Sequence, residues 1–380
     1  MPSTPLRQNV LAAAKKVVVK LGTQVLRGPG AAAKCGLDED YLADVARQVV
    51  ALRDKGVEVT LVSSGAIGAG CATLQLSSRP TDVARQQAVA AVGQPQLMAL
   101  MQRAFARHGV QTAQMLLTRG DFDDRDRFLN IRNCVSQLHA LGAVPVINEN
   151  DTVAVDEIRF GDNDMLAALL CNALRGDALV LLTMAAGLLD EQGQRIDLVE
   201  DILAAIAQTR THSFGKTAWG TGGITAKLEA VRLVVDSGEV AVIACGREPD
   251  VLPRLFSGEK LGTVFVPADR KLDARQRWIA LTKRPAGTIT IDEGAVAAVR
   301  DKGKSLLAGG IVDATGAFAR GELVMVRDAT GREVGRGLIN YSADEVRLIM
   351  GKKSSQFEKL LGRPAYAEVI HRDNLVTAAR

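Results

Sequence analysis

Between residue 17 and about residue 267, short runs of β-branched and other apolar residues alternate with longer stretches of helical periodicity. This alternation is typical of a mostly parallel, open β-sheet covered by helices on both faces, because parallel strands need long crossover connections. A helix expected over residues 41–55 ends at Gly56, where glycine favours a left-handed cap. The expected strands are residues 17–21, 57–62, 110–117, 143–147, 178–182, 240–244 and 263–266.

The composition changes near residue 268. Residues 269–284 are basic, and from residue 285 to about 370 short strand-like runs are separated by many glycines, which predicts a small all-β domain. We therefore expect a catalytic α/β domain over residues 1–268, a basic linker over residues 269–284 and a β-domain over residues 285–370. The β-domain holds nearly equal numbers of basic and acidic residues and few aromatic ones, so RNA binding is not expected.

The 380 residues carry a small formal net charge of +4, and 47% of them are hydrophobic, which is enough to build sizeable cores. Five cysteines without a close pair predict neither a disulfide framework nor a zinc site. The first 14 residues lack the order of a signal peptide, and no run is long enough to span a membrane. We therefore expect a cytoplasmic protein without a membrane partner.

Lys20 stands inside the apolar run of residues 17–21 and is followed closely by Gly22. Burying an unpaired ammonium group is costly, so this side chain must either reach solvent or meet an anion. We favour contact with an anionic ligand, such as a phosphate that approaches the backbone at Gly22. The alternative is an edge-strand lysine whose ammonium group extends into water.

Polar segments follow two of the expected strands. Ser63 and Ser64 come after residues 57–62 and open a helix, while residues 148–151 (NEND) come after residues 143–147, with residues 161–164 (GDND) close behind. Ligands of open α/β sheets bind where strands end. Each segment alone could be a helix cap or a polar turn. Their shared sheet edge instead favours a site for a small charged molecule.

Two of these side chains suit an amino acid substrate. Asp151 can pair with an α-ammonium group, and Asn163 can offer both a donor and an acceptor to a neighbouring carboxylate. Further along, residues 220–227 (GTGGITAK) supply a glycine loop, a helix start and Lys227, and we expect residues 209–223 to form a mobile loop with Lys227 exposed. Such loops can cradle phosphates, although a flexible linker with a surface lysine is the alternative.

Several stretches resemble the glutamate 5-kinase branch of the amino acid kinase family, whose members carry a C-terminal PUA domain. The most specific are residues 145–151 (PVINEND) and 161–164 (GDND). The others in the first domain are residues 18–23, 63–67, 91–94, 114–119, 127–130 and 221–227. The second domain resembles a PUA fold at residues 309–311, 318, 321–324 and 337–342.

The resemblance implies ATP-dependent phosphorylation of the side-chain carboxylate of L-glutamate to L-glutamyl 5-phosphate, the first step of proline biosynthesis, with proline as an inhibitor. It implies Mg²⁺ bridging the phosphates of ATP, with no residue assigned as a direct metal ligand. Lys20, Lys227 and Asp164 would be catalytic, and Ser64, Asp151 and Asn163 would bind glutamate. The ATP-binding residues would be Lys20, Thr183, Met184, Thr221, Gly222, Gly223, Ile224, Thr225, Ala226 and Lys227. We also expect a homo-oligomer.

The residue types agree with this chemistry. A glutamate side chain is already ionised at neutral pH, so the reaction needs alignment and charge neutralisation rather than a general base. One departure is Met184, which stands where the family usually has aspartate and cannot supply a carboxylate.

Two alternatives to this function remain open. The chain could be another amino acid kinase, acting on acetylglutamate, aspartate or carbamate, or an RNA-binding regulator built on a degraded kinase scaffold.

Overall fold

The computed structural model of the chain describes residues 10–27, 36–154, 163–190, 192–211, 223–267 and 285–377. The chain divides into two compact units, Met1–Lys271 and Leu272–Arg380. The expected linker over residues 269–284 lies outside the described residues, so the predicted domain boundaries stay predictions. Among the described residues, the helices are all too short or too polar to cross a membrane.

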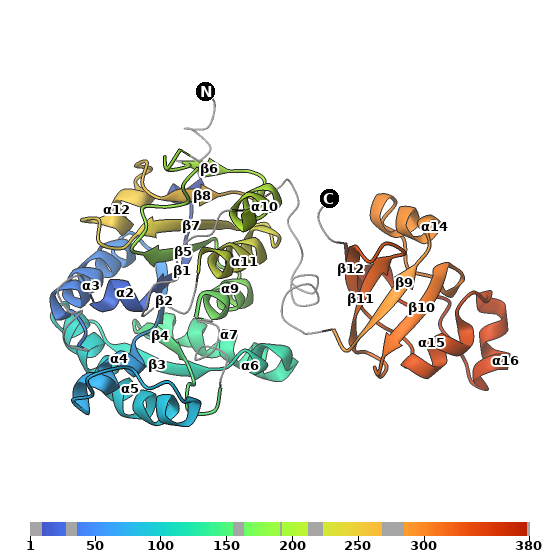
Figure 1. Ribbon diagram of the computed structural model, residues 1–380, viewed down its shortest axis with the longest axis horizontal. Helices are drawn as coiled ribbons and strands as arrows, with labels where there is room; N and C mark the ends of the chain where they lie inside the picture. Colours follow the sequence, from blue (N-terminus) through green and yellow to red (C-terminus); the bar gives the residue numbers. More distant parts are fainter. Residues whose placement is uncertain are drawn as a thin grey trace. The chain divides into compact units, whose positions relative to one another are not determined.

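An eight-stranded sheet runs through the first unit in the order β3-β4-β2-β1-β5-β7-β8-β6 (Figure 1). The strands from β3 to β7 pair in parallel, which confirms the predicted mostly parallel sheet. The last two strands differ, because β8 runs antiparallel to β7 and is paired by β6, which is too short to predict from a pattern. The strands are β1 (Lys16–Leu21), β2 (Glu58–Ser63), β3 (Thr112–Leu117), β4 (Val144–Glu149), β5 (Ala178–Thr183), β6 (Leu198–Val199), β7 (Val240–Cys245) and β8 (Thr263–Phe265).

Helices cover both faces of this sheet (Figure 1). Helices α2, α3, α5 and α12 share a core with one face, whereas α7, α9, α10 and α11 share a second core with the other. The predicted stop after α3 is present, with Gly56 at φ +79°. The helices are α2 (Thr23–Arg27), α3 (Glu39–Arg53), α4 (Ala66–Thr73), α5 (Val83–Ala106), α6 (Gly120–Asp123), α7 (Arg125–Ala140), α9 (Asn163–Leu174), α10 (Ile202–Thr211), α11 (Ile224–Val235) and α12 (Val251–Phe256).

The side-chain alternation of β1 decides which way Lys20 points. Val17 and Val19 enter the core with α3 and α5, whereas Val18 enters the core with α9 and α11. Side chains two positions apart in a strand share a face. Lys20 therefore lies on the same face as Val18, toward α9 and α11. Its ammonium group is near the first turn of α9, which contains Asp164.

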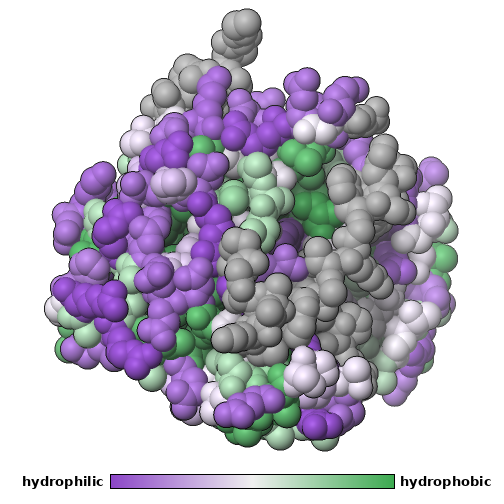
Figure 2. Space-filling view, turned by 60° about the vertical axis from the view of Figure 1, so that its left-hand side comes forward, coloured by the Kyte–Doolittle hydropathy of each residue, from purple (hydrophilic) through white to green (hydrophobic). Residues whose placement is uncertain are grey.

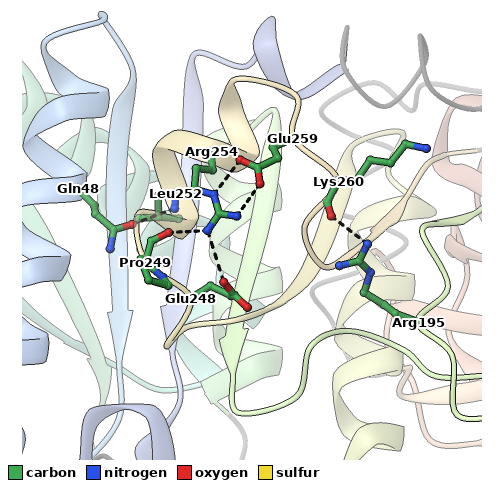
Figure 3. Close-up of polar contacts among 8 residues, drawn as sticks. All are labelled: Gln48, Arg195, Glu248, Pro249, Leu252, Arg254, Glu259 and Lys260. Carbon is green, nitrogen blue, oxygen red and sulfur yellow. Dashed lines mark hydrogen bonds and ion pairs between the residues drawn. The ribbon is translucent and has the colours of Figure 1, made fainter.

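The connection between β7 and β8, which contains α12, is fastened by polar contacts on two sides (Figure 3). Arg254 donates two hydrogen bonds to the Glu259 carboxylate, at 2.7 and 2.5 Å. Gln48 of α3 accepts a hydrogen bond from the backbone N–H of Leu252 at 2.9 Å. Arg195, in the segment after β5, donates to a backbone carbonyl near the start of β8 at 2.9 Å. The connection thereby ties α3 to the segment that follows β5.

The second unit is built on a five-stranded sheet in the order β10-β9-β11-β12-β13. The predicted β-domain is confirmed, but short helices accompany the sheet. Ser342 and Glu345 form a capping box that starts α15. The elements are β9 (Gly287–Ile291), α14 (Glu293–Val296), β10 (Ile311–Gly316), β11 (Leu323–Asp328), β12 (Glu333–Leu338), α15 (Ala343–Ile349), α16 (Phe357–Leu361) and β13 (Leu375–Thr377), with single 3-10 or π turns at Ala297–Asp301, Ala308–Gly310, Ser354–Gln356 and Arg372–Asn374.

Candidate active site

Three charged side chains from separate elements meet at the sheet edge where the parallel strands end. Lys20 comes from β1, Asp164 from the first turn of α9 and Lys227 from the first turn of α11. The Lys20 Nζ atom lies 2.8 Å from Asp164 Oδ1, and the Lys227 Nζ atom lies 2.8 Å from Asp164 Oδ2. Only 2% of the Asp164 side chain is exposed. One buried carboxylate therefore bridges two ammonium groups.

The charges in this centre do not cancel, because one carboxylate faces two ammonium groups. Burial raises the pKa of Asp164, but attraction to Lys20 and Lys227 outweighs burial and holds that pKa below its usual value. Burial lowers the pKa of Lys227 more than the Asp164 carboxylate raises it, and the Lys20 ammonium lowers it further. The surplus positive charge in a water-poor site suits an anion with several oxygens, such as a phosphate group.

The structure corrects the expected surroundings of Lys227. The lysine does not lie in an exposed loop, because α11 begins at Ile224 and only 15% of the lysine side chain is exposed. Gly223 precedes the helix, Thr225 and Ala226 belong to its first turn, and Thr221 and Gly222 lie outside the described residues. Residues 209–211 also belong to a helix, α10, rather than to the expected loop. Threonine is a weak helix former, and such propensities are readily overridden.

A chain of buried amide groups lies beside the charged centre. The Asn163 Nδ2 atom donates to Ser64 Oγ at 3.0 Å, to the Ser63 carbonyl at 3.2 Å and to Asn148 Oδ1 at 3.0 Å. The Asn148 Nδ2 atom in turn donates to Gln94 Oε1 at 2.8 Å. These contacts link the ends of β2 and β4 to α9 and α5. The structure thus brings the predicted substrate residues Ser64 and Asn163 into direct contact.

Gln94 has no predicted role from the sequence, although residues 91–94 are among the stretches that carry the family resemblance. A glutamine in a long helical pattern looks like any solvent-facing polar residue. The signal that could have found it is its position, three residues before Leu97, which is fully buried on the same helix face. Asn148 was likewise noted only as part of a polar segment.

The other predicted substrate residue, Asp151, lies in the turn after β4 and is 6% exposed. Ser64 does not act as a plain helix cap, because the N-cap of α4 is Gly65 at φ +106°. Glycines of this region allow close packing between helices. A Cβ atom at Gly93 would lie only 1.8 Å from the Ala66 carbonyl oxygen. Helix α5 therefore runs against the start of α4 at backbone contact distance.

The end of β5 holds the two remaining residues predicted to bind ATP. Strand β5 lies between β1 and β7 and runs parallel to both, so its last residue, Thr183, lies at the same sheet edge as the charged centre. The Thr183 Oγ1 atom accepts a hydrogen bond from the Ala185 N–H at 3.5 Å, and Met184 is 40% exposed. Their contact with ATP stays a prediction, as does the approach of a phosphate to Gly22.

Comparison with known proteins adds a family to this geometry. The amino acid kinase family profile matches residues 15–245, and the PUA domain profile matches residues 287–361. A glutamate 5-kinase from Methylococcus capsulatus is 44% identical over 97% of this chain and 99% of its own length. Another, from Chromohalobacter salexigens, is 45% identical over 97% of each chain. The chain therefore belongs to the amino acid kinase family, in its glutamate 5-kinase branch with a C-terminal PUA domain.

This finding confirms the resemblance drawn from the sequence. Among solved structures, a carbamate kinase from Giardia lamblia bound to AMP-PNP matches 68% of this chain and 100% of its own, at 18% identity and a TM-score of 0.48. That likeness is too distant to bear on substrate or mechanism.

Proposed function

We propose that the centre of Lys20, Asp164 and Lys227 transfers the γ-phosphoryl group of ATP to the side-chain carboxylate of L-glutamate. The product is L-glutamyl 5-phosphate, in the first step of proline biosynthesis. The observation that carries this proposal is the single buried carboxylate that holds two ammonium groups, each at 2.8 Å, with one positive charge left over. The similarity to glutamate 5-kinases over nearly the whole chain supports the choice of substrate.

The reaction forms one bond and breaks one. A carboxylate oxygen of glutamate attacks the γ-phosphorus, and the bond from that phosphorus to the bridging oxygen breaks, so ADP leaves with the electron pair. The attacking carboxylate is ionised at neutral pH, so no side chain has to remove a proton. Asp164 then serves to hold the two lysines, which neutralise charge on the transferring and leaving oxygens.

Magnesium is expected to enter as part of the ATP complex. Both oxygens of Asp164 already contact lysines. Across the part of the chain that the structure describes, no group of three or more His, Cys, Asp or Glu side chains is placed to hold a metal ion. This donor set fits a magnesium ion held by the phosphates of ATP, where it would shield their negative charge.

The remaining residues divide between the two substrates. Asp151 would pair with the α-ammonium group of glutamate, while Ser64 and Asn163 would contact its carboxylates. The ATP-binding set would be Lys20, Thr183, Met184, Thr221, Gly222, Gly223, Ile224, Thr225, Ala226 and Lys227. Because Met184 offers no carboxylate, the base of the nucleotide would be held by packing and backbone groups.

The direct test is ATP consumption by the purified chain with L-glutamate, acetylglutamate, aspartate or carbamate as acceptor. We expect turnover with glutamate alone, lower turnover when proline is added, and a homo-oligomer in sedimentation. Turnover with another acceptor instead would assign the chain to a different amino acid kinase. Salt-sensitive retention of RNA together with no ATP turnover would support the regulator alternative and overturn the proposal.

Replacing Asp151 by alanine tests the assigned partner of the α-ammonium group. We expect the KM for glutamate to rise roughly 30-fold or more, since losing one member of a buried charge pair costs about 2 kcal/mol or more. The KM for ATP should stay close to the wild-type value, which serves as the internal control. An unchanged dependence of rate on glutamate concentration would remove Asp151 from the substrate site.

A further inference from the structure

Gln94 presents a buried amide group that is only half used. It lies on α5 and is 8% exposed. Its Oε1 atom accepts the hydrogen bond from Asn148, at 2.8 Å. Its Nε2 atom is buried and has no hydrogen-bond partner among the described residues. Buried amide donors are nearly always paired, so an exception beside a polar site calls for a ligand atom.

The hydrogen bonds of this chain determine where the oxygen and the nitrogen of each amide point. A carboxamide has one accepting atom and one donating atom. Because Asn148 donates to Gln94, the Oδ1 atom of Asn148 is left to accept from Asn163 at 3.0 Å and from the backbone N–H of Glu149 at 2.9 Å. The donating side of Gln94 is therefore not consumed by the chain and is available to a substrate oxygen.

The position of Gln94 relative to the phosphoryl-transfer centre selects the substrate group that it can meet. Gln94 contacts the end of β4, and β4 is separated from β1, which carries Lys20, by one strand, β2. Two strand spacings amount to about 10 Å. A five-carbon amino dicarboxylate with a hydrogen bond at each end spans a similar length. When its side-chain carboxylate lies at Lys20, its α-carboxylate reaches the end of β4, near Asp151.

The backbone of Gln94 is held tightly in place. Its neighbour Gly93 packs against the start of α4, where a Cβ atom would meet the Ala66 carbonyl oxygen at 1.8 Å and the Gly70 nitrogen at 2.3 Å. Helix α4 begins two residues after Ser64. The donor on Gln94 is thus fixed relative to Ser64, as recognition of a small carboxylate requires.

We propose that Gln94 is a specificity-determining residue whose Nε2 atom donates a hydrogen bond to the α-carboxylate of glutamate, so that the site discriminates between a free α-carboxylate and an α-amide. This inference rests on the proposed function. The donor prefers an anionic acceptor, since hydrogen bonds to charged groups are the stronger ones. The amide of an α-amidated glutamate carries no charge, so its oxygen is a weaker acceptor, and its NH2 group would place a second donor against Gln94.

The experiment compares kcat/KM for L-glutamate and for its α-amide, L-isoglutamine, in four proteins. Gln94→Met keeps the length of the side chain and removes both the donor and the acceptor of the amide. Gln94→Glu keeps an acceptor for Asn148 but replaces the donor by a second oxygen. Gln86→Met is the matched control, because Gln86 lies on the same helix with the same 8% exposure and donates to the Pro80 carbonyl instead. Wild type is the reference.

We expect Gln94→Met to lower kcat/KM for glutamate roughly 10- to 100-fold while that for the α-amide changes little, as loss of one charged hydrogen bond predicts. In Gln94→Glu, the preference should shift further toward the α-amide, whose N–H can donate to the new carboxylate. Gln86→Met should leave the ratio of the two kcat/KM values unchanged. A Gln94 variant that lowers kcat/KM equally for both substrates, or for neither, would overturn the inference. Wild type without glutamate turnover would instead refute the proposed function.

Discussion

Asp164 is the residue on which the charged centre depends, because its carboxylate separates two buried ammonium groups. Replacing it by asparagine keeps the shape but leaves Lys20 and Lys227 side by side without a counter-charge. We expect the free energy of unfolding to fall by about 3–5 kcal/mol, the usual cost of removing one partner from a buried ion pair. Urea denaturation measures this change, and turnover should be lost with it.

A second substitution provides the control for this prediction. Adding Lys20→Met to Asp164→Asn removes one of the unpaired charges, so part of the lost stability should return.

In the wild type, the pKa of Asp164 is lowered by folding. Its contribution is therefore present above the ordinary value of 3.8 and is lost as pH falls through the folded pKa. An asparagine variant as stable as wild type would show that the lysines find other anions.

The lowered pKa of Lys227 predicts how turnover depends on alkaline pH. As pH rises through a pKa below the ordinary 10.5, Lys227 loses its proton and the centre loses its surplus charge. We therefore expect kcat/KM for ATP, which reports the ionisation of the free protein, to fall at a lower pH than ordinary lysine titration would give. Lys227→Arg keeps its charge at every accessible pH, so its alkaline fall should move upward even if its maximal rate is lower. If the alkaline fall occurs at the same pH in wild type and in Lys227→Arg, a group other than Lys227 causes it.

At the scale of secondary-structure elements, the crossing of α4 and α5 links helix packing to the substrate site. Gly93→Ala would place a methyl group 1.8 Å from the Ala66 carbonyl oxygen, so the two helices must separate. We expect a loss of about 3 kcal/mol or more of unfolding free energy, the upper end for overpacking. The KM for glutamate should also rise, because Ser64 and Gln94 flank this contact.

The matched control for that prediction is Gly120→Ala in α6, where the nearest atom to an added Cβ is Thr118 Oγ1, at an ordinary 3.7 Å. This substitution should leave unfolding and KM nearly unchanged, since alanine is the better helix former. If Gly93→Ala behaves like the control, the helices are able to separate without disturbing the site, and the proposed coupling is wrong.

On the scale of the whole molecule, each compact unit has a hydrophobic core of its own, and the residues of the charged centre and of the amide chain all belong to the first unit. Among the coloured residues of Figure 2, hydrophilic side chains predominate and hydrophobic ones form several patches between them. The first unit therefore contains both the described part of the site and the apolar contacts that stabilise it.

A shortened chain of residues 1–271 tests this independence. We expect it to unfold cooperatively and to keep kcat within about threefold of the full-length value, because the charged centre, the amide chain and two hydrophobic cores all belong to the first unit. Circular dichroism during thermal unfolding and ATP consumption are the two measurements. A shortened chain that folds but does not turn over would show that the second unit contributes to catalysis.

Much of the fold could be predicted because strand and helix patterns are local. The seven expected strands and the stop at Gly56 all appear, with shifts of one or two residues at the ends. The antiparallel β8 could not be predicted, because an apolar run reads the same in either direction. Helix α15 is too short for its periodicity to stand out, and only the capping box of Ser342 and Glu345 indicates it. The sequence does not show that Lys227 is buried in a helix, because α11 starts only three residues before it and follows a run rich in threonine and glycine.

The sequence by itself determined the period of each strand, the polar residues at strand ends and the family to which the chain belongs. These depend on neighbours a few positions apart. Only the tertiary structure decided that Lys20 and Lys227 share one carboxylate and that Gln94 contacts Asn148. These contacts join residues far apart in the chain, and they arise from how helices pack on the sheet, where backbone contacts such as that of Gly93 set the distances.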